Sequence, residues 1–65
     1  MADFEALCKH IIDTNGHPNE QDVLNCGYSK ENFKRIEDAN AKPERLVKNA
    51  RDCLRARGLY YKEGV

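Results

Sequence analysis

The sequence has no long hydrophobic stretch. Charged side chains interrupt its first 12 residues at Asp3, Glu5 and Lys9, so these residues do not form the apolar segment of a signal peptide. No apolar run elsewhere approaches the roughly 20 residues that a membrane-spanning helix needs. We therefore expect neither a secretion signal nor a membrane anchor.

Cysteine is scarce and odd in number, with Cys8, Cys26 and Cys53 spread along the chain. Small secreted domains that are stapled by disulfides normally carry an even set, so we expect a reducing, cytoplasmic location. The cysteines and the two histidines also lack the paired Cys-x-x-Cys or His-x₃₋₅-His spacing of zinc sites. We expect all three cysteines to pack as small hydrophobic residues, with no metal and no cofactor.

The sequence also lacks the features of a catalytic site. No nucleophile elbow, oxyanion-hole loop or phosphate-cradling glycine run accompanies the cysteines and histidines, and the four glycines are isolated. A chain of 65 residues has little concave surface with which to enclose a substrate. We expect a binding or structural protein rather than an enzyme.

Charge of one sign is not in excess, because 11 Lys and Arg match 11 Asp and Glu. The distribution is uneven, however. Residues 1–41 carry four cations and eight carboxylates, a net −4, whereas residues 42–65 carry seven cations and three carboxylates, a net +4. A basic C-terminal segment suits an anionic partner, but the two halves can equally attract each other within the fold.

The chain does contain four segments with the apolar periodicity of amphipathic helices, and it has no strand pattern or internal repeat. Residues that cap or stop helices separate the segments. The third segment has only a thin apolar stripe, so much of its surface is expected to be exposed. We predict one all-α domain over residues 1–65, a compact bundle with helices over 3–14, 19–26, 29–41 and 43–57 and a frayed tail over 62–65.

A tripeptide, Gly27-Tyr28-Ser29, separates the second and third helices. Gly27 is expected to end the second helix, because glycine adopts the left-handed conformation without steric cost. Ser29 is expected to cap the third helix. Tyr28 between them is predicted to contact Val23 on one side and Phe33 on the other.

Residues 19–38 resemble the helix–turn–helix of bacterial and phage DNA-binding proteins. They read as a short helix, a glycine turn and a longer helix, with Phe33 and Ile36 six and nine residues after Gly27. The run from Gly27 to Lys30 is also similar to the turn in the DNA-binding part of phage small terminase subunits. The resemblance covers 20 of the 65 residues and departs from the family at Val23, where a small residue is usual.

This resemblance implies a helix-turn-helix-like centre whose third helix enters the major groove of duplex DNA. Lys34 and Arg35 would bind guanine or phosphate, and Asn32 would read adenine. The fourth helix would contact backbone phosphates. The residues implied to contact DNA are Ser29, Lys30, Glu31, Asn32, Lys34 and Arg35, followed by Lys48, Arg51 and Arg55 of the fourth helix.

Three alternatives remain open. The same charges suit a solvated helix surface, because four opposite-charge pairs are spaced four residues apart: Glu31–Arg35, Lys34–Asp38, Glu44–Lys48 and Lys48–Asp52. The second alternative is a small protein-interaction module, an adaptor or inhibitor, whose contact surface is formed by Leu59, Tyr60 and Tyr61. A homodimer that completes its small core across two subunits is the third alternative.

Overall fold

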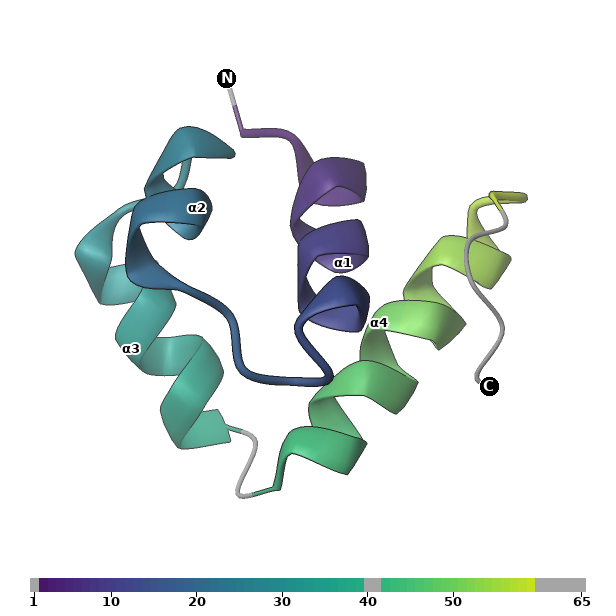
Figure 1. Ribbon diagram of the computed structural model, residues 1–65. Helices are drawn as coiled ribbons and strands as arrows, with labels where there is room; N and C mark the ends of the chain where they lie inside the picture. Colours follow the sequence, from purple (N-terminus) through teal and green to yellow (C-terminus); the bar gives the residue numbers. More distant parts are fainter. Residues whose placement is uncertain (1, 40–41, 60–65) are drawn as a thin grey trace.

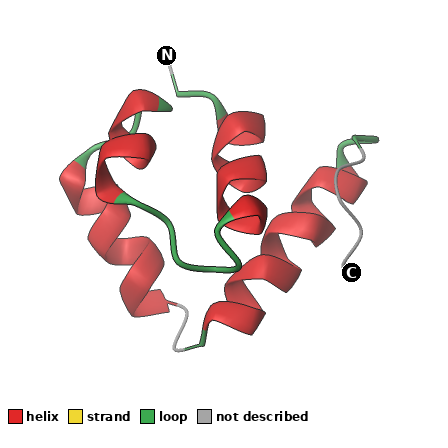
Figure 2. Cartoon of the chain, in the orientation of Figure 1, coloured by secondary structure: helices red, strands yellow, loops and turns green. Residues whose placement is uncertain are grey.

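The computed structural model describes residues 2–39 and 42–59. Short loops connect its helices, and no strand occurs in these two ranges (Figure 2). The all-α prediction is confirmed, and each helix ends within two residues of its predicted bounds. The predicted frayed tail lies outside the described residues. The helices are α1 (Phe4–Asp13), α2 (Glu20–Asn25), α3 (Lys30–Ala39) and α4 (Pro43–Ala56) (Figure 1).

The helices pack as two pairs, α1 against α4 and α2 against α3. In Figure 1, α3 and α4 are the two arms of a V that converge where α3 ends and α4 begins. α1 lies between the arms, and α2 lies on the side of α3. The molecule is a thin body of 28 × 26 × 16 Å. The buried core of the described residues is correspondingly small, with eight members.

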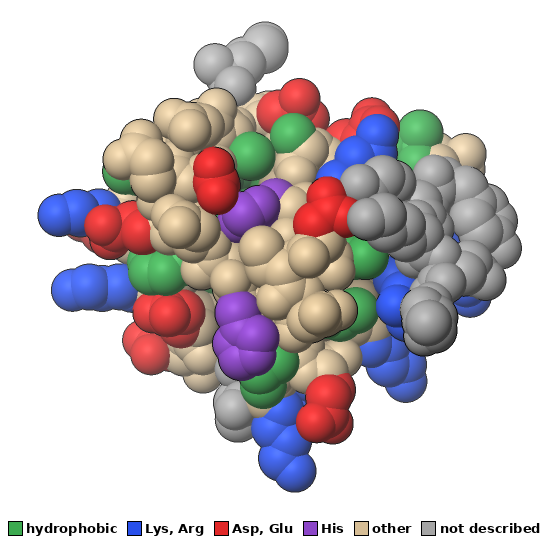
Figure 3. Space-filling view, in the orientation of Figure 1, with side chains coloured by type: hydrophobic (Ala, Val, Ile, Leu, Met, Phe, Trp, Pro, Cys, Tyr) green, Lys and Arg blue, Asp and Glu red, His purple; other side chains and the backbone are tan. Residues whose placement is uncertain are grey.

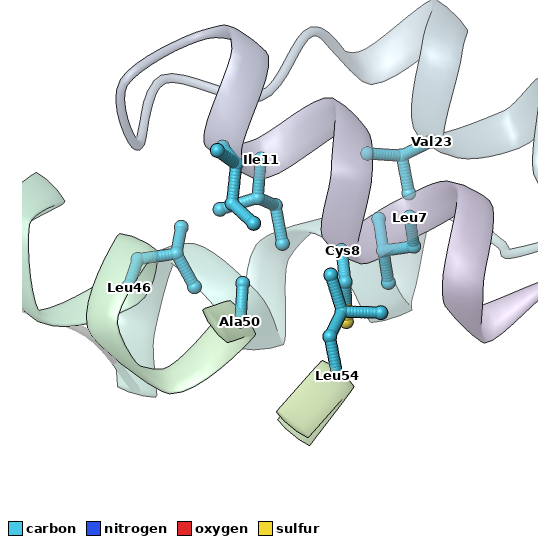
Figure 4. Packing of buried hydrophobic residues seen from close by; sticks show 8 residues of the cluster. Leu7, Cys8, Ile11, Val23, Leu46, Ala50 and Leu54 are labelled. Atoms are coloured by element: carbon cyan, nitrogen blue, oxygen red, sulfur yellow. The ribbon is translucent and has the colours of Figure 1, made fainter. Parts of the chain in front are cut away.

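The core lies where α1 meets α4 and α2 (Figure 4). Every member of it is at most 8 % exposed. α3 contributes no fully buried residue, only the half-buried Phe33 and Ile36 that pack against the core. The thin apolar stripe predicted for this helix is therefore confirmed, and α3 is the most peripheral helix. The core residues are Leu7, Cys8, Ile11 and Ile12 of α1, Val23 of α2, and Leu46, Ala50 and Leu54 of α4.

Backbone residues in the left-handed region follow three of the helices. Gly27 (φ 94°) and Gly58 (φ 74°) take this role after α2 and α4. After α1 the first left-handed residue is Asn15 (φ 54°), and Gly16 (φ 85°) follows it. Gly16 is also buried against the start of α4, where an added Cβ would lie 2.7 Å from the Cα and the carbonyl carbon of Pro43. This contact joins the end of α1 to the start of α4.

Candidate nucleic-acid interface

The segment that resembles a helix–turn–helix begins with α2, which is fixed at both ends. At its start, the side-chain oxygen of Asn19 accepts a hydrogen bond of 2.8 Å from the Gln21 N–H. At its end, the Tyr28 N–H donates to the Val23 carbonyl over 3.3 Å, with Gly27 left-handed between them. This is the hydrogen bond of a Schellman ending. The prediction that Gly27 ends the second helix is confirmed, and a four-residue turn leads to α3.

A reciprocal cap fixes the start of α3. The Asn32 N–H donates to Ser29 Oγ over 3.2 Å, while Asn32 Oδ1 accepts from the Ser29 N–H (3.1 Å) and from Ser29 Oγ (2.9 Å). This is a capping box in which asparagine stands where glutamate or glutamine is usual. The prediction that Ser29 caps the helix is confirmed. Asn32 reads adenine only by using the same oxygen that accepts from Ser29, so a bidentate base contact would disrupt the cap.

Replacing Asn32 with alanine is expected to lower the free energy of unfolding by about 1 kcal/mol, because two donors of Ser29 lose their acceptor. Asn32→Asp keeps a side-chain oxygen in the same place and adds negative charge at the positive end of the helix. It should therefore retain the wild-type stability. Urea unfolding followed by circular dichroism measures both. Equal losses in the two variants would show that the cap contributes nothing.

Val23 packs α2 against the core, in contact with α1. It is 0 % exposed and is directed towards Leu7 of α1 (Figure 4). Tyr28 and Phe33, on either side of the cap, are half-buried against the same core. Burial raises the pKa of the Tyr28 hydroxyl above its usual value. The bulk of Val23, which departs from the helix–turn–helix pattern, is thus used to bind α2 to α1.

The outer surface of α3 is charged. Glu31, Lys34, Arg35 and Asp38 follow the three- and four-residue spacing of one helix face, and all four are exposed. Lys30 is exposed at the start of the same helix. None of the four ion pairs predicted for α3 and α4 (Glu31–Arg35, Lys34–Asp38, Glu44–Lys48 and Lys48–Asp52) forms a salt bridge between the described side chains. The cations of this face are therefore not in direct ion-pair contact with the carboxylates that share it.

The cations predicted to bind phosphate on α4 lie on the other arm of the V (Figure 1). Lys48 and Arg55 are exposed, whereas Arg51 is half-buried and its Nε has no hydrogen-bond partner within residues 2–39 and 42–59. Lys and Arg side chains lie at the left, lower and right edges of the face in Figure 3, and acidic, histidine and uncharged groups occupy its centre. The structure thus divides the predicted DNA-contact residues into two groups.

The surface predicted for a protein partner is only partly described. Leu59 is half-buried against the core, and its N–H donates to the Leu54 carbonyl over 2.8 Å. Tyr60 and Tyr61 lie outside the described residues. Leu59 therefore helps to close the end of α4. The role of the two tyrosines as a protein-contact surface stays a prediction.

The cysteines are free thiols. Cys8 is buried, and Cys26 and Cys53 are half-buried against the core. Burial, with a smaller contribution from the neighbouring Cys53, raises the pKa of the Cys8 thiol from 9.0 to about 11. Burial likewise raises the pKa of Cys26. Cys8 is thus an unreactive core residue at neutral pH.

The described ranges contain neither a cluster of metal-ligating side chains nor a membrane-spanning helix. No group of three or more histidine, cysteine, aspartate or glutamate side chains within them is arranged to hold a metal ion. No described helix combines the length and the hydrophobicity that crossing a bilayer requires.

Comparison with known proteins found no matching family model, no matching curated protein and no matching solved structure. The resemblance of residues 19–38 to helix–turn–helix proteins accordingly stays a prediction from the sequence.

Proposed function

We propose that the chain binds duplex DNA through the N-terminal half of α3. The observation that supports this most is the arrangement of α3, the most peripheral helix, which is held by a glycine turn and a reciprocal cap. Residues 30–35 carry three cations and one carboxylate, a net +2, whereas Glu37 and Asp38 make the C-terminal half acidic. In helix–turn–helix proteins the N-terminal residues of the second helix contact DNA.

The proposed contacts are chiefly to phosphate. Lys30, Lys34 and Arg35 are exposed, and none of them forms a salt bridge with a described carboxylate. Asn32 is engaged in the cap, so the proposal removes it from base recognition. Contacts of lysine and arginine to phosphate carry little sequence information. The proposal therefore expects weak, salt-sensitive binding with low sequence specificity.

Charge variants of α3 test this proposal. Lys34→Gln should weaken binding to a labelled duplex about fivefold at low salt, because one phosphate contact is lost. For the same reason, the slope of the logarithm of the binding constant against the logarithm of the salt concentration should become shallower by about one. Glu31→Gln should strengthen binding, since Glu31 shares the exposed face with Lys34 and Arg35 and repels phosphate. Fluorescence anisotropy across a salt series measures both variants.

Lys48→Gln is the matched control, because Lys48 is an equally exposed lysine on the opposite arm of the V. It should leave the affinity for the duplex within about twofold of the wild type, because salt screens the interaction of a distant charge with the bound DNA. Equal weakening by Lys34→Gln and Lys48→Gln would contradict an interface limited to α3. No anisotropy change for the wild type at about 50 mM salt would end the proposal of DNA binding.

One observation favours a second candidate, a protein-interaction module. The exposed face of α3 carries two carboxylates and two cations, so it is neutral as a whole. A neutral face of alternating charge suits a protein partner with complementary charges better than it suits a polyanion. The double charge reversal Lys34→Glu with Arg35→Glu should then abolish capture of a partner that the wild-type chain binds. Capture that is lost after nuclease treatment would instead indicate nucleic acid.

A further inference from the structure

His10, in the last turn of α1, contacts the start of α2 through a single ring nitrogen. The Asn19 backbone N–H donates to His10 Nε2 over 3.0 Å, which requires that this nitrogen carry no proton. The same Nε2 lies 3.7 Å from the Asp22 carboxylate of α2. An ion pair with Asp22 requires the opposite state, in which Nε2 is protonated. The two neighbours of one atom therefore demand different protonation states of the ring.

We infer that His10 is a protonation-dependent latch that changes its partner at the start of α2. The neutral ring accepts from Asn19, the residue whose side chain caps α2. The protonated ring repels that N–H and pairs with Asp22. Because the imidazole is only 17 % exposed, it has little access to solvent as a substitute partner. Protonation thus moves the contact from the loop to the first turn of α2, while α1 and α2 stay joined.

Other charged groups lie near His10 along α1 and in the following loop. Lys9, next to His10 on α1, is engaged by Glu5 at 2.6 Å. Asp13 lies at the end of α1 and is three residues from His10. Both histidines lie on the face shown in Figure 3, but His17 is exposed in the loop. Asp22 is the carboxylate within ion-pair distance of the ring in the described part of the chain.

A pH titration followed by nuclear magnetic resonance tests the latch, because histidine ordinarily changes charge between about pH 5 and 8. The Asn19 amide should titrate with the same midpoint as the His10 ring. Its hydrogen-exchange protection factor should fall about fivefold once the ring is protonated, as expected for one net hydrogen bond. An Asn19 amide that does not follow the His10 ring in the wild-type chain would overturn the inference without any variant.

Two glutamine variants sharpen the result. His10→Gln removes the titration, so the Asn19 amide should become independent of pH in this range. His17→Gln removes the other imidazole from the same loop, and the Asn19 amide should still titrate with His10. Persistence of the Asn19 titration in His10→Gln, or its loss in His17→Gln, would assign the effect to His17 and contradict the latch. The proposed DNA binding enters neither measurement.

Discussion

Leu54→Ala is expected to unfold a large fraction of the chain at room temperature. Leu54 is only 2 % exposed where α4 faces α1 (Figure 4), and with Val23 it is one of the two largest fully buried side chains. Removing a buried leucine side chain costs about 2–5 kcal/mol, because apolar contacts are lost and a cavity remains. A single small core supplies only about 3–5 kcal/mol of stability. Far-UV circular dichroism in a urea series measures the loss.

Leu24→Ala makes the same chemical change at a contrasting position. Leu24 lies on α2 and is half-buried, and it is not among the residues that pack against the core. Its replacement should cost less than about 1 kcal/mol, because little apolar surface is lost and alanine favours the helix. Similar losses for Leu24→Ala and Leu54→Ala would contradict the assignment of the core to the interface of α1 and α4.

Gly16→Ala is expected to have the second largest effect, a loss of roughly 3 kcal/mol or more. The new Cβ would lie 2.7 Å from two backbone atoms of Pro43 and closer still to the Pro43 carbonyl oxygen. A backbone neighbour cannot rotate away, so the loop after α1 has to separate from the start of α4. The left-handed φ of 85° adds strain of its own. Thermal unfolding of the purified variant measures the effect.

Gly58→Ala separates these two contributions. Gly58 has a similar φ of 74°, but a Cβ there would meet nothing within 4 Å. Only the backbone strain remains, which amounts to about 1–2 kcal/mol. A loss at Gly16 no greater than the loss at Gly58 would show that the contact with Pro43 does not constrain the fold.

Local signals along the chain were sufficient to predict the helices. The start of α3 follows from Ser29, and the end of α2 follows from Gly27, because caps and left-handed glycines act on neighbouring residues. The apolar spacing of α1 and α4 also identified the faces that pack together. These features depend on contacts within about five residues, which the sequence pattern contains.

Contacts between distant segments were not predictable in the same way. Gly16 was recognisable as a turn residue, but its approach to Pro43 depends on how α1 packs on α4. The contact of His10 with Asn19 joins residues nine positions apart across a loop and has no periodic signal. A pattern search also could not show that Asn32 is engaged in the cap.

The placement of the charged residues changed the candidate site most. Spacing four residues apart makes Lys34–Asp38 a plausible ion pair, yet exposed pairs gain little and long side chains keep their freedom. Lys34–Asp38 does not form a salt bridge in the described structure, and neither do the three other pairs predicted for α3 and α4. The helix–turn–helix resemblance places the cations of α3 in the major groove and those of α4 on the backbone phosphates of the same duplex. The divergence of the two arms separates these helices (Figure 1).

The most direct test of the account is to map duplex DNA onto the isotope-labelled chain by nuclear magnetic resonance. Titration at low salt with a duplex of about two helical turns reports every amide that senses DNA. We expect shifts that cluster at Ser29, Lys30, Lys34 and Arg35 and decline as salt is added, whereas the amides of Arg51 and Arg55 should not shift. Shifts confined to α4, or no shifts with any duplex, would contradict the assignment of α3 as a DNA-binding helix.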